Sequence, residues 1–202
     1  ENAGSSLTIT ATLSTATTAD VTVTIGTAGT ATEGTDYSDG SGNLDDITIS
    51  AGSTTGTVSF TPTDDASDPV YEENETAIIS IDGVSGGSAS ESGSQSVTIT
   101  ITENESAPTV TLARSAASIA ENSGSTVTIT ATLSIKVDEA VTVALSTSGA
   151  ATEGTDYGTI SDITVSAGAT TGTATFDPTD DSVYEDDEAA TIAIDSVSGG
   201  GA

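Results

Sequence analysis

The sequence of 202 residues contains no cysteine, histidine, methionine or tryptophan, and its only basic side chains are Arg114 and Lys136. Without cysteine, disulfide bonds are impossible. Without cysteine and histidine, neither a zinc site of the usual kind nor a histidine-activated nucleophile can form. Two basic side chains cannot neutralise a phosphate backbone, which argues against nucleic acid and anionic membrane surfaces as partners. No apolar run approaches the roughly 20 residues of a membrane-spanning helix, so we expect no membrane insertion.

Acidic residues, in contrast, are abundant: 31 Asp and Glu give a formal net charge of −29. A chain this acidic with 3% aromatic residues could be disordered. However, 34% of the residues are hydrophobic, and they alternate with Thr and Ser. This alternation predicts β-strands that have one buried and one solvated face. The start of the sequence has neither an initiator Met nor a signal peptide, so we expect a piece of a longer protein or a processed product.

The chain contains an internal repeat. The heptapeptide ATEGTDY at residues 31–37 recurs unchanged at residues 151–157, an offset of 120. The offset falls to 113 where Tyr71-Glu72 matches Tyr184-Glu185. Length changes of this kind are expected in the loops between strands.

Two domains are therefore predicted, at residues 1–105 and 106–202. The second repeat opens with a lead-in strand near 108–112 that the first lacks, and the first closes with a strand at 95–102 that the second lacks. We expect each repeat to miss one edge strand. One explanation is that the chain is an excerpt from a longer tandem array. The other is that chains join head to tail, each supplying a strand that the next one lacks.

The predicted fold class is all-β. About seven short strands per repeat, separated by Gly, Ser, Asp and Asn, favour two tandem immunoglobulin-like antiparallel β-sandwiches. The core of Val and Ile, with one Phe per repeat, is thin, so we expect a further interaction to hold each module together. In the first repeat the alternating apolar residues predict strands near 7–13, 21–25, 47–49, 58–60, 77–81 and 97–101.

Acidic residues recur at matched positions in the two repeats, at the ends of the predicted strands and in the loops between them. Carboxylates that lie close together repel one another, and a cation makes such an arrangement favourable. Ca²⁺ accepts 6–8 oxygen ligands in flexible geometry and is the first choice, whereas Mg²⁺ demands stricter octahedral geometry. The spacing does not match the 12-residue calcium loop of EF-hands.

Three motifs in each repeat resemble those of Calx-beta domains. They are Glu-Asn-x-Gly at residues 1–4 and 121–124, Ala-Thr-x-Gly-x-Asp-Tyr at 31–37 and 151–157, and Asp-Asp followed by Tyr-Glu-x-x-Glu at 64–75 and 180–188. Tandem Calx-beta domains occur in sodium–calcium exchangers, in integrin β4 and in large bacterial surface proteins. The resemblance implies tandem Calx-beta domains of a bacterial-type extracellular repeat or adhesin protein, and it spans nearly the whole chain.

The resemblance also implies calcium ligands, because the acids in these motifs and after the last strand form the calcium sites of the family. The closing acids here are Glu103-Asn104-Glu105, where the family can have a run of Asp, and the second repeat has no closing acids. The implied ligands are Glu1, Asp36, Asp64, Asp65, Glu72, Glu75, Glu103 and Glu105 in the first repeat, and Glu121, Asp156, Asp180, Asp181, Glu185 and Glu188 in the second.

From these features we expect a non-enzymatic, calcium-binding structural or adhesive repeat module of a long extracellular or cell-surface protein. Calcium would stiffen the junction between repeats, and chains would assemble head to tail as a filament by strand complementation. The partners would be neighbouring repeats or like subunits, with an unidentified cell-surface or matrix ligand. The alternative is a calcium-sensing regulatory module of a larger membrane-associated protein.

Overall fold

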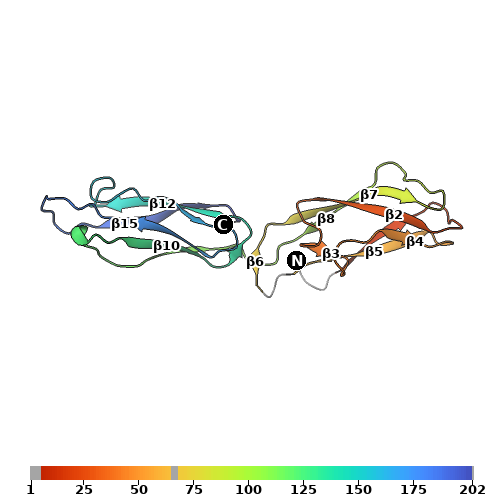
Figure 1. Ribbon diagram of the computed structural model, residues 1–202, viewed down its shortest axis with the longest axis horizontal. Coiled ribbons are helices and arrows are strands. Elements are labelled where there is room, and N and C mark those ends of the chain that lie inside the picture. Colours follow the sequence, from red (N-terminus) through yellow and green to blue (C-terminus); the bar gives the residue numbers. More distant parts are fainter. Residues whose placement is uncertain (1–5, 65–67, 202) are drawn as a thin grey trace. The chain divides into compact units, whose positions relative to one another are not determined.

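The computed structural model describes residues 6–64 and 68–201. Within these residues the chain is all-β, as predicted, and one 3₁₀ turn, η1 (Glu121–Ser123), is the exception. The chain divides into two compact units (Figure 1). The first comprises Glu1–Ser67 and Glu73–Asn104, and the second comprises Asp68–Glu72 and Glu105–Ala202. The predicted boundary between residues 105 and 106 stays a prediction. No helix in the described part of the chain is long and apolar enough to cross a membrane.

The first unit consists of two antiparallel sheets. In each sheet, β-branched residues alternate with Thr and Ser, which places one face of the strand inside. One sheet has the strand order β1 (Leu7–Thr12), β5 (Thr55–Pro62), β3 (Tyr37–Ser38), and the other has the order β4 (Ile47–Ile49), β2 (Val21–Gly29), β7 (Glu75–Ser85), β8 (Ser96–Ile101).

The second unit repeats this arrangement with two three-stranded antiparallel sheets. A parallel two-stranded sheet joins β6 (Val70–Tyr71) to β11 (Lys136–Val137), which brings residues 68–72 into this unit. The other strand orders are β14 (Thr171–Phe176), β10 (Val127–Leu133), β9 (Val110–Arg114), and β13 (Ile163–Val165), β12 (Val141–Gly149), β15 (Ala190–Ser198).

Both cores are built from small aliphatic side chains and one stacked aromatic pair. Tyr37 stacks on Phe60 with ring centroids 4.6 Å apart, and Tyr157 stacks on Phe176 at 4.7 Å.

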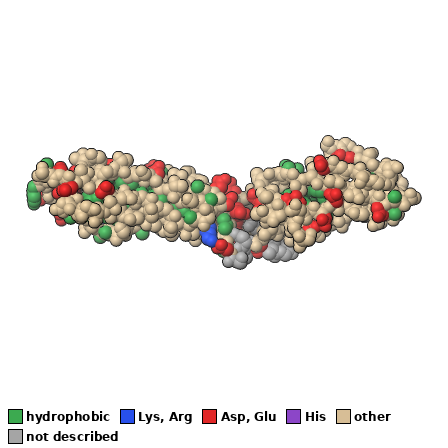
Figure 2. All heavy atoms as spheres, viewed as in Figure 1, with side chains coloured by type: hydrophobic (Ala, Val, Ile, Leu, Met, Phe, Trp, Pro, Cys, Tyr) green, Lys and Arg blue, Asp and Glu red, His purple; other side chains and the backbone are tan. Residues whose placement is uncertain are grey.

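Uncharged polar groups and backbone cover most of the visible surface, with Asp and Glu in smaller patches (Figure 2). This pattern fits strands whose solvated faces carry Thr and Ser.

The two units differ in how their edge strands are covered. Strand β10 pairs with β14 on one side and β9 on the other, whereas the equivalent β1 pairs only with β5 within the described residues. Val127 on β10 is 6% exposed, whereas its counterpart Leu7 on β1 is 49% exposed. Alternation along the strand predicts that Leu7 shares the buried side of its strand with Ile9 and Ala11, and the exposure of Leu7 shows that this prediction is wrong.

Val97, the first of the alternating apolar residues in the predicted strand near 97–101, is 50% exposed, although alternation predicts that it shares the buried side with Ile101. It lies on β8, the outermost strand of its sheet, opposite Ile79 of β7. Farther along the same strand, Ile101 is buried in the core. Alternation along the sequence identifies the strand, but the depth of each side chain depends on how far the opposing sheet extends.

Strand coverage predicts unequal sensitivity of two equivalent isoleucines to truncation. Ile129→Ala on β10 should lower the free energy of unfolding by about 2–5 kcal/mol, because a buried side chain is lost and a cavity remains. Ile9→Ala on β1, where Ile9 is only half-buried, should cost less than half as much. Urea unfolding followed by circular dichroism measures both. Equal losses would contradict the role of β9 in burying β10.

Candidate metal centre

Asp36 is held by the turn that the repeated heptapeptide forms. The backbone N–H of Thr32 donates to Oδ2 of Asp36, and the N–H of Asp36 donates to the carbonyl of Thr32 at 2.9 Å. Gly34 supplies the positive φ of +82° that the turn needs. The next residue, Tyr37, is fully buried and anchors the turn to the core. One oxygen of Asp36 thus stabilises the loop and fixes the direction of the carboxylate.

The second repeat builds the same turn. The N–H of Thr152 donates to Oδ2 of Asp156, Asp156 N–H donates to the Thr152 carbonyl at 2.9 Å, and Gly154 has a φ of +84°. Tyr157 takes the anchoring position of Tyr37. Identical sequence therefore produces an identical carboxylate support in both units.

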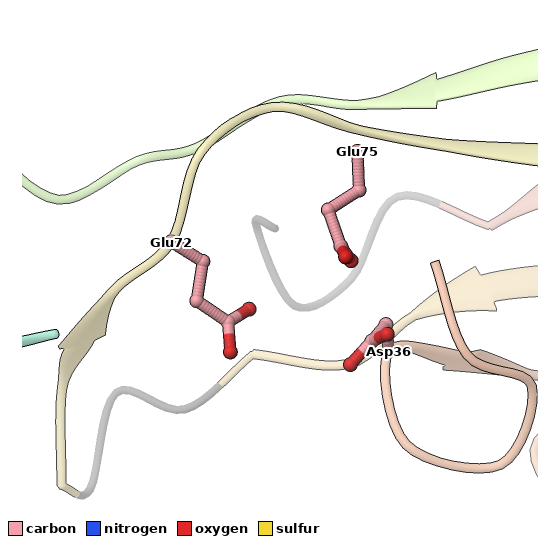
Figure 3. Close-up of side chains that lie close together, drawn as sticks. All are labelled: Asp36, Glu72 and Glu75. Atoms are coloured by element: carbon pink, nitrogen blue, oxygen red, sulfur yellow. The ribbon is translucent and has the colours of Figure 1, made fainter. Parts of the chain in front are cut away.

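Three of the predicted ligands converge in the first repeat. One carboxylate oxygen from each of Asp36, Glu72 and Glu75 lies within 4.8 Å of the others (Figure 3). Glu75 begins β7, and Glu72 precedes it by three residues. All three side chains are half-buried, and Oε2 of Glu75 is shielded from solvent. In the part of the chain that the structure describes, this is the one group of acids that converges so closely.

The chemistry of this group suits a hard divalent cation. Three carboxylates supply part of the 6–8 oxygens that Ca²⁺ requires, and water or backbone carbonyls complete such sites. Metals that prefer thiolate or imidazole find no ligands, because the sequence has no Cys and no His. Asp36, Glu72 and Glu75 would therefore hold the ion.

Tyr37 lies next to Asp36 and keeps its proton. Burial raises the pKa of its hydroxyl, and the negative charges of Glu33 and Asp36 raise it further. The phenol is therefore neutral at physiological pH and adds no charge beside the acidic cluster.

The remaining predicted ligands of the first repeat lie outside this close group. Asp64 follows β5 and is half-buried, as are Glu103 and Glu105 after β8. The N–H of Glu103 donates to Oδ1 of Asn74 at 2.9 Å, so the segment after β8 lies beside the residue that precedes Glu75. Glu1 and Asp65 lie outside the described residues.

In the second repeat the predicted ligands border a cleft of about 720 Å³. Glu121, Asp156, Glu185 and Glu188 all line it, whereas Asp180 and Asp181 do not. Reduced contact with water raises the pKa of Glu185, and the negative charges of Asp156, Asp181, Glu188 and Glu121 add to the increase. These carboxylates repel one another, but they are more exposed and more widely spaced than those of the first repeat.

Two other acids of each repeat have a structural role. Glu33 accepts hydrogen bonds from the Leu44 N–H at 2.6 Å and the Thr27 hydroxyl at 3.0 Å, and Glu153 accepts the matching pair from Ile160 and Thr147. Recurrence at matched positions does not separate such loop-stabilising acids from ligands.

Asp46 and Asp162 also accept backbone hydrogen bonds. Their partners are the N–H groups of Ile25 and Leu145, at 3.1 and 3.0 Å. Each bond lies where a β-bulge shifts the register of the strand. Sequence reasoning missed this role, although both aspartates occur directly before the matched ITIS and ITVS segments.

Comparison with known proteins separates the two halves of the chain. Residues 1–105, which make up more than half of the chain, match the family model described as Calx-beta domain. Residues 106–202 match the model described as LapA domain. None of the curated proteins compared with the chain matches it.

Two solved structures are similar to the chain. The crystal structure of CBD12 from CALX1.2 is 20% identical with a TM-score of 0.40, and the match covers 86% of this chain and 68% of that chain. The calcium binding domain CBD12 of CALX1.1 is 19% identical, also with a TM-score of 0.40, and the match covers 93% and 73%.

Repulsion at Glu185 predicts opposite effects of one substitution in two conditions. In a chelator, Glu185→Gln should raise the thermal unfolding temperature of the second unit by a few degrees, because it removes one of several like charges. Addition of calcium should then raise the unfolding temperature of this variant by less than it raises that of the unsubstituted chain. Differential scanning calorimetry measures both effects. The control is Glu139→Gln, at an exposed loop position of the same unit; equal behaviour of the two variants would contradict the prediction.

Proposed function

Because the chain belongs to the Calx-beta domain family, we propose that it is a calcium-binding structural module of a long extracellular or cell-surface protein, with an adhesive rather than a catalytic role. The observation that carries the proposal is the convergence of Asp36, Glu72 and Glu75 within 4.8 Å. Three carboxylates at this separation are unfavourable without a cation. A bound divalent ion therefore stabilises the folded loop.

The second part of the proposal concerns what calcium does to the chain. The formal net charge of −29 makes the repeats repel one another and resist compaction. Calcium ions bound at the acidic loops lower this charge and reduce the freedom of the chain between the repeats. The module then acts as a stiffened element, and like modules follow one another head to tail.

Removal of one carboxylate should weaken calcium binding. Extracellular calcium modules bind with dissociation constants of about 10⁻⁴–10⁻³ M, and we expect the first repeat to fall in this range. Glu75→Gln should raise the dissociation constant about tenfold or more, since it removes a half-buried ligand. Isothermal titration calorimetry with calcium measures the change.

The matched control is Glu73→Gln, which removes the same charge two residues earlier from an exposed side chain outside the cluster. It should leave the affinity within about twofold of the unsubstituted chain. Equal weakening by both variants would indicate a diffuse charge effect and no defined site. Magnesium in place of calcium should bind more weakly, because its octahedral geometry is stricter.

Calcium should also change the dimensions of the chain in solution. Small-angle X-ray scattering in chelator and in millimolar calcium compares the maximum dimension and the flexibility of the two states. We expect a narrower distribution of dimensions with calcium, because bound ions restrict the chain between the repeats. Identical scattering profiles at saturating calcium would contradict the stiffening role while leaving calcium binding itself intact.

A further inference from the structure

Strand β11 of the second unit binds a short segment that precedes β7 in the sequence. It pairs in parallel with Val70 and Tyr71, and the N–H of Asp138 donates to the Tyr71 carbonyl at 3.4 Å. Tyr71 packs against the core cluster of this unit, which includes the fully buried Val137. Residues 68–72 therefore belong to the second unit, although they lie within the sequence of the first repeat.

Two further contacts hold this segment in place. Nζ of Lys136 donates to both carboxylate oxygens of Asp68, at 2.6 and 2.7 Å. The ring of Tyr71 approaches Gly201 so closely that a Cβ at this position would overlap it. The ion pair is partly exposed, so it aligns the segment more than it stabilises it, whereas the half-buried ring removes apolar surface from water.

The matched positions of the first repeat have different side chains. At the repeat offset of 120, Lys136 and Val137 correspond to Ala16 and Thr17. Ala16 has no charge to pair with a carboxylate. Thr17 is only half-buried, and its hydroxyl donates to the carbonyl of Ala19 at 2.7 Å. These positions of the first repeat thus offer neither the cation nor the apolar side chain that the segment contacts in the second.

The close contact at Gly201 is also particular to the second repeat. The turn after β7 reads VSGGS at residues 84–88, and the turn after β15 reads VSGGG at residues 197–201, so Gly201 corresponds to Ser88. Both residues have a left-handed backbone, with φ of +66° and +56°. A Ser is therefore compatible with the turn itself, but at position 201 its Cβ would occupy the space of the Tyr71 ring.

The bound segment has a counterpart of nearly the same sequence. Residues 68–71 read Asp-Pro-Val-Tyr, and residues 181–184 read Asp-Ser-Val-Tyr. In the second place Val183 is 58% exposed and Tyr184 is 89% exposed, and Asp181 accepts the N–H of Val183 at 2.6 Å. The burial of the first Val-Tyr pair therefore comes from the surface that it contacts and is not a property of the motif alone.

We propose that β11 and the turn at residues 199–201 form a receptor for an Asp-x-Val-Tyr segment of the preceding repeat, and that Lys136 and Gly201 determine which repeats have this receptor. The cation selects the Asp, and the missing side chain at position 201 admits the aromatic ring. A Ser there excludes the ring, and such steric exclusion is a common source of specificity. The contacts use none of the expected calcium ligands, so the receptor is independent of the proposed function.

Amide hydrogen exchange of the full chain, followed by NMR in chelator, tests the receptor. The N–H of Asp138 reports binding of the segment, because it donates to the Tyr71 carbonyl. The N–H of Gly168 reports the fold of β11, because it donates to the Val137 carbonyl at 2.8 Å. Gly201→Ser should speed exchange at Asp138 at least tenfold and leave exchange at Gly168 within about twofold. Unchanged exchange at Asp138 would overturn the proposal.

A double-variant comparison separates overlap with the ring from strain in the turn. Gly201→Ser should lower the unfolding temperature of the second unit, measured by differential scanning calorimetry. In a chain that already carries Tyr71→Ala, the same substitution should lower it less than half as much, because the ring is absent. Equal decreases in the two backgrounds would attribute the effect to the backbone and overturn the proposal. Ser88→Gly in the first repeat is the control and should not change exchange at Asp138.

Three variants examine the segment itself, and they decide the question if Gly201→Ser also exposes Gly168. Pro69→Ser converts residues 68–71 to the sequence of residues 181–184 and should leave exchange at Asp138 within about threefold. Lys136→Ala and Asp68→Asn should each speed this exchange about threefold, and the two together no more than either alone. Loss of protection in Pro69→Ser, or additive effects of the other two, would overturn the proposal.

Discussion

Packing of two antiparallel sheets across a core one side chain thick is the constraint on which the rest of this structure depends. In such a core every buried residue needs a neighbour in both sheets, so the loss of one edge strand exposes several positions at once. Ile129 pairs with β9 and is 5% exposed, whereas its counterpart Ile9 on β1, which has no such neighbour within the described residues, is only half-buried. Ile79 and Ile192 show the same effect at the opposite sheet.

The acidic residues divide into two physical classes. Some carboxylates accept hydrogen bonds from backbone N–H groups and stabilise loops or bulges, as Glu33 and Asp46 do. Others face like charges, as Glu72 and Glu75 do with Asp36. Backbone N–H groups stabilise a carboxylate of the first class, whereas a bound cation would relieve the repulsion among those of the second class. The proposed calcium binding and stiffening both depend on this second class.

Most of the fold was predictable from the sequence, because period-two alternation and the internal repeat identify strands without knowledge of their partners. The candidate site was predictable only in part. Asp36, Glu72 and Glu75 were among the expected ligands, and the structure brings them together. Asp180 and Asp181 were expected by the same motif, but they do not line the cleft that the other second-repeat acids border. Motif matching identifies the loop, and the local path of the backbone decides the distance between carboxylates.

The sequence by itself determined the all-β class, the duplication and the exclusion of thiolate and imidazole chemistry, because these follow from residue types and their order. Only the tertiary structure decided which acids are bound by backbone N–H groups and which three converge. These properties depend on distances between residues far apart in the chain. Two repeats with nearly the same motifs therefore differ in the burial of their cores and in the spacing of their carboxylates.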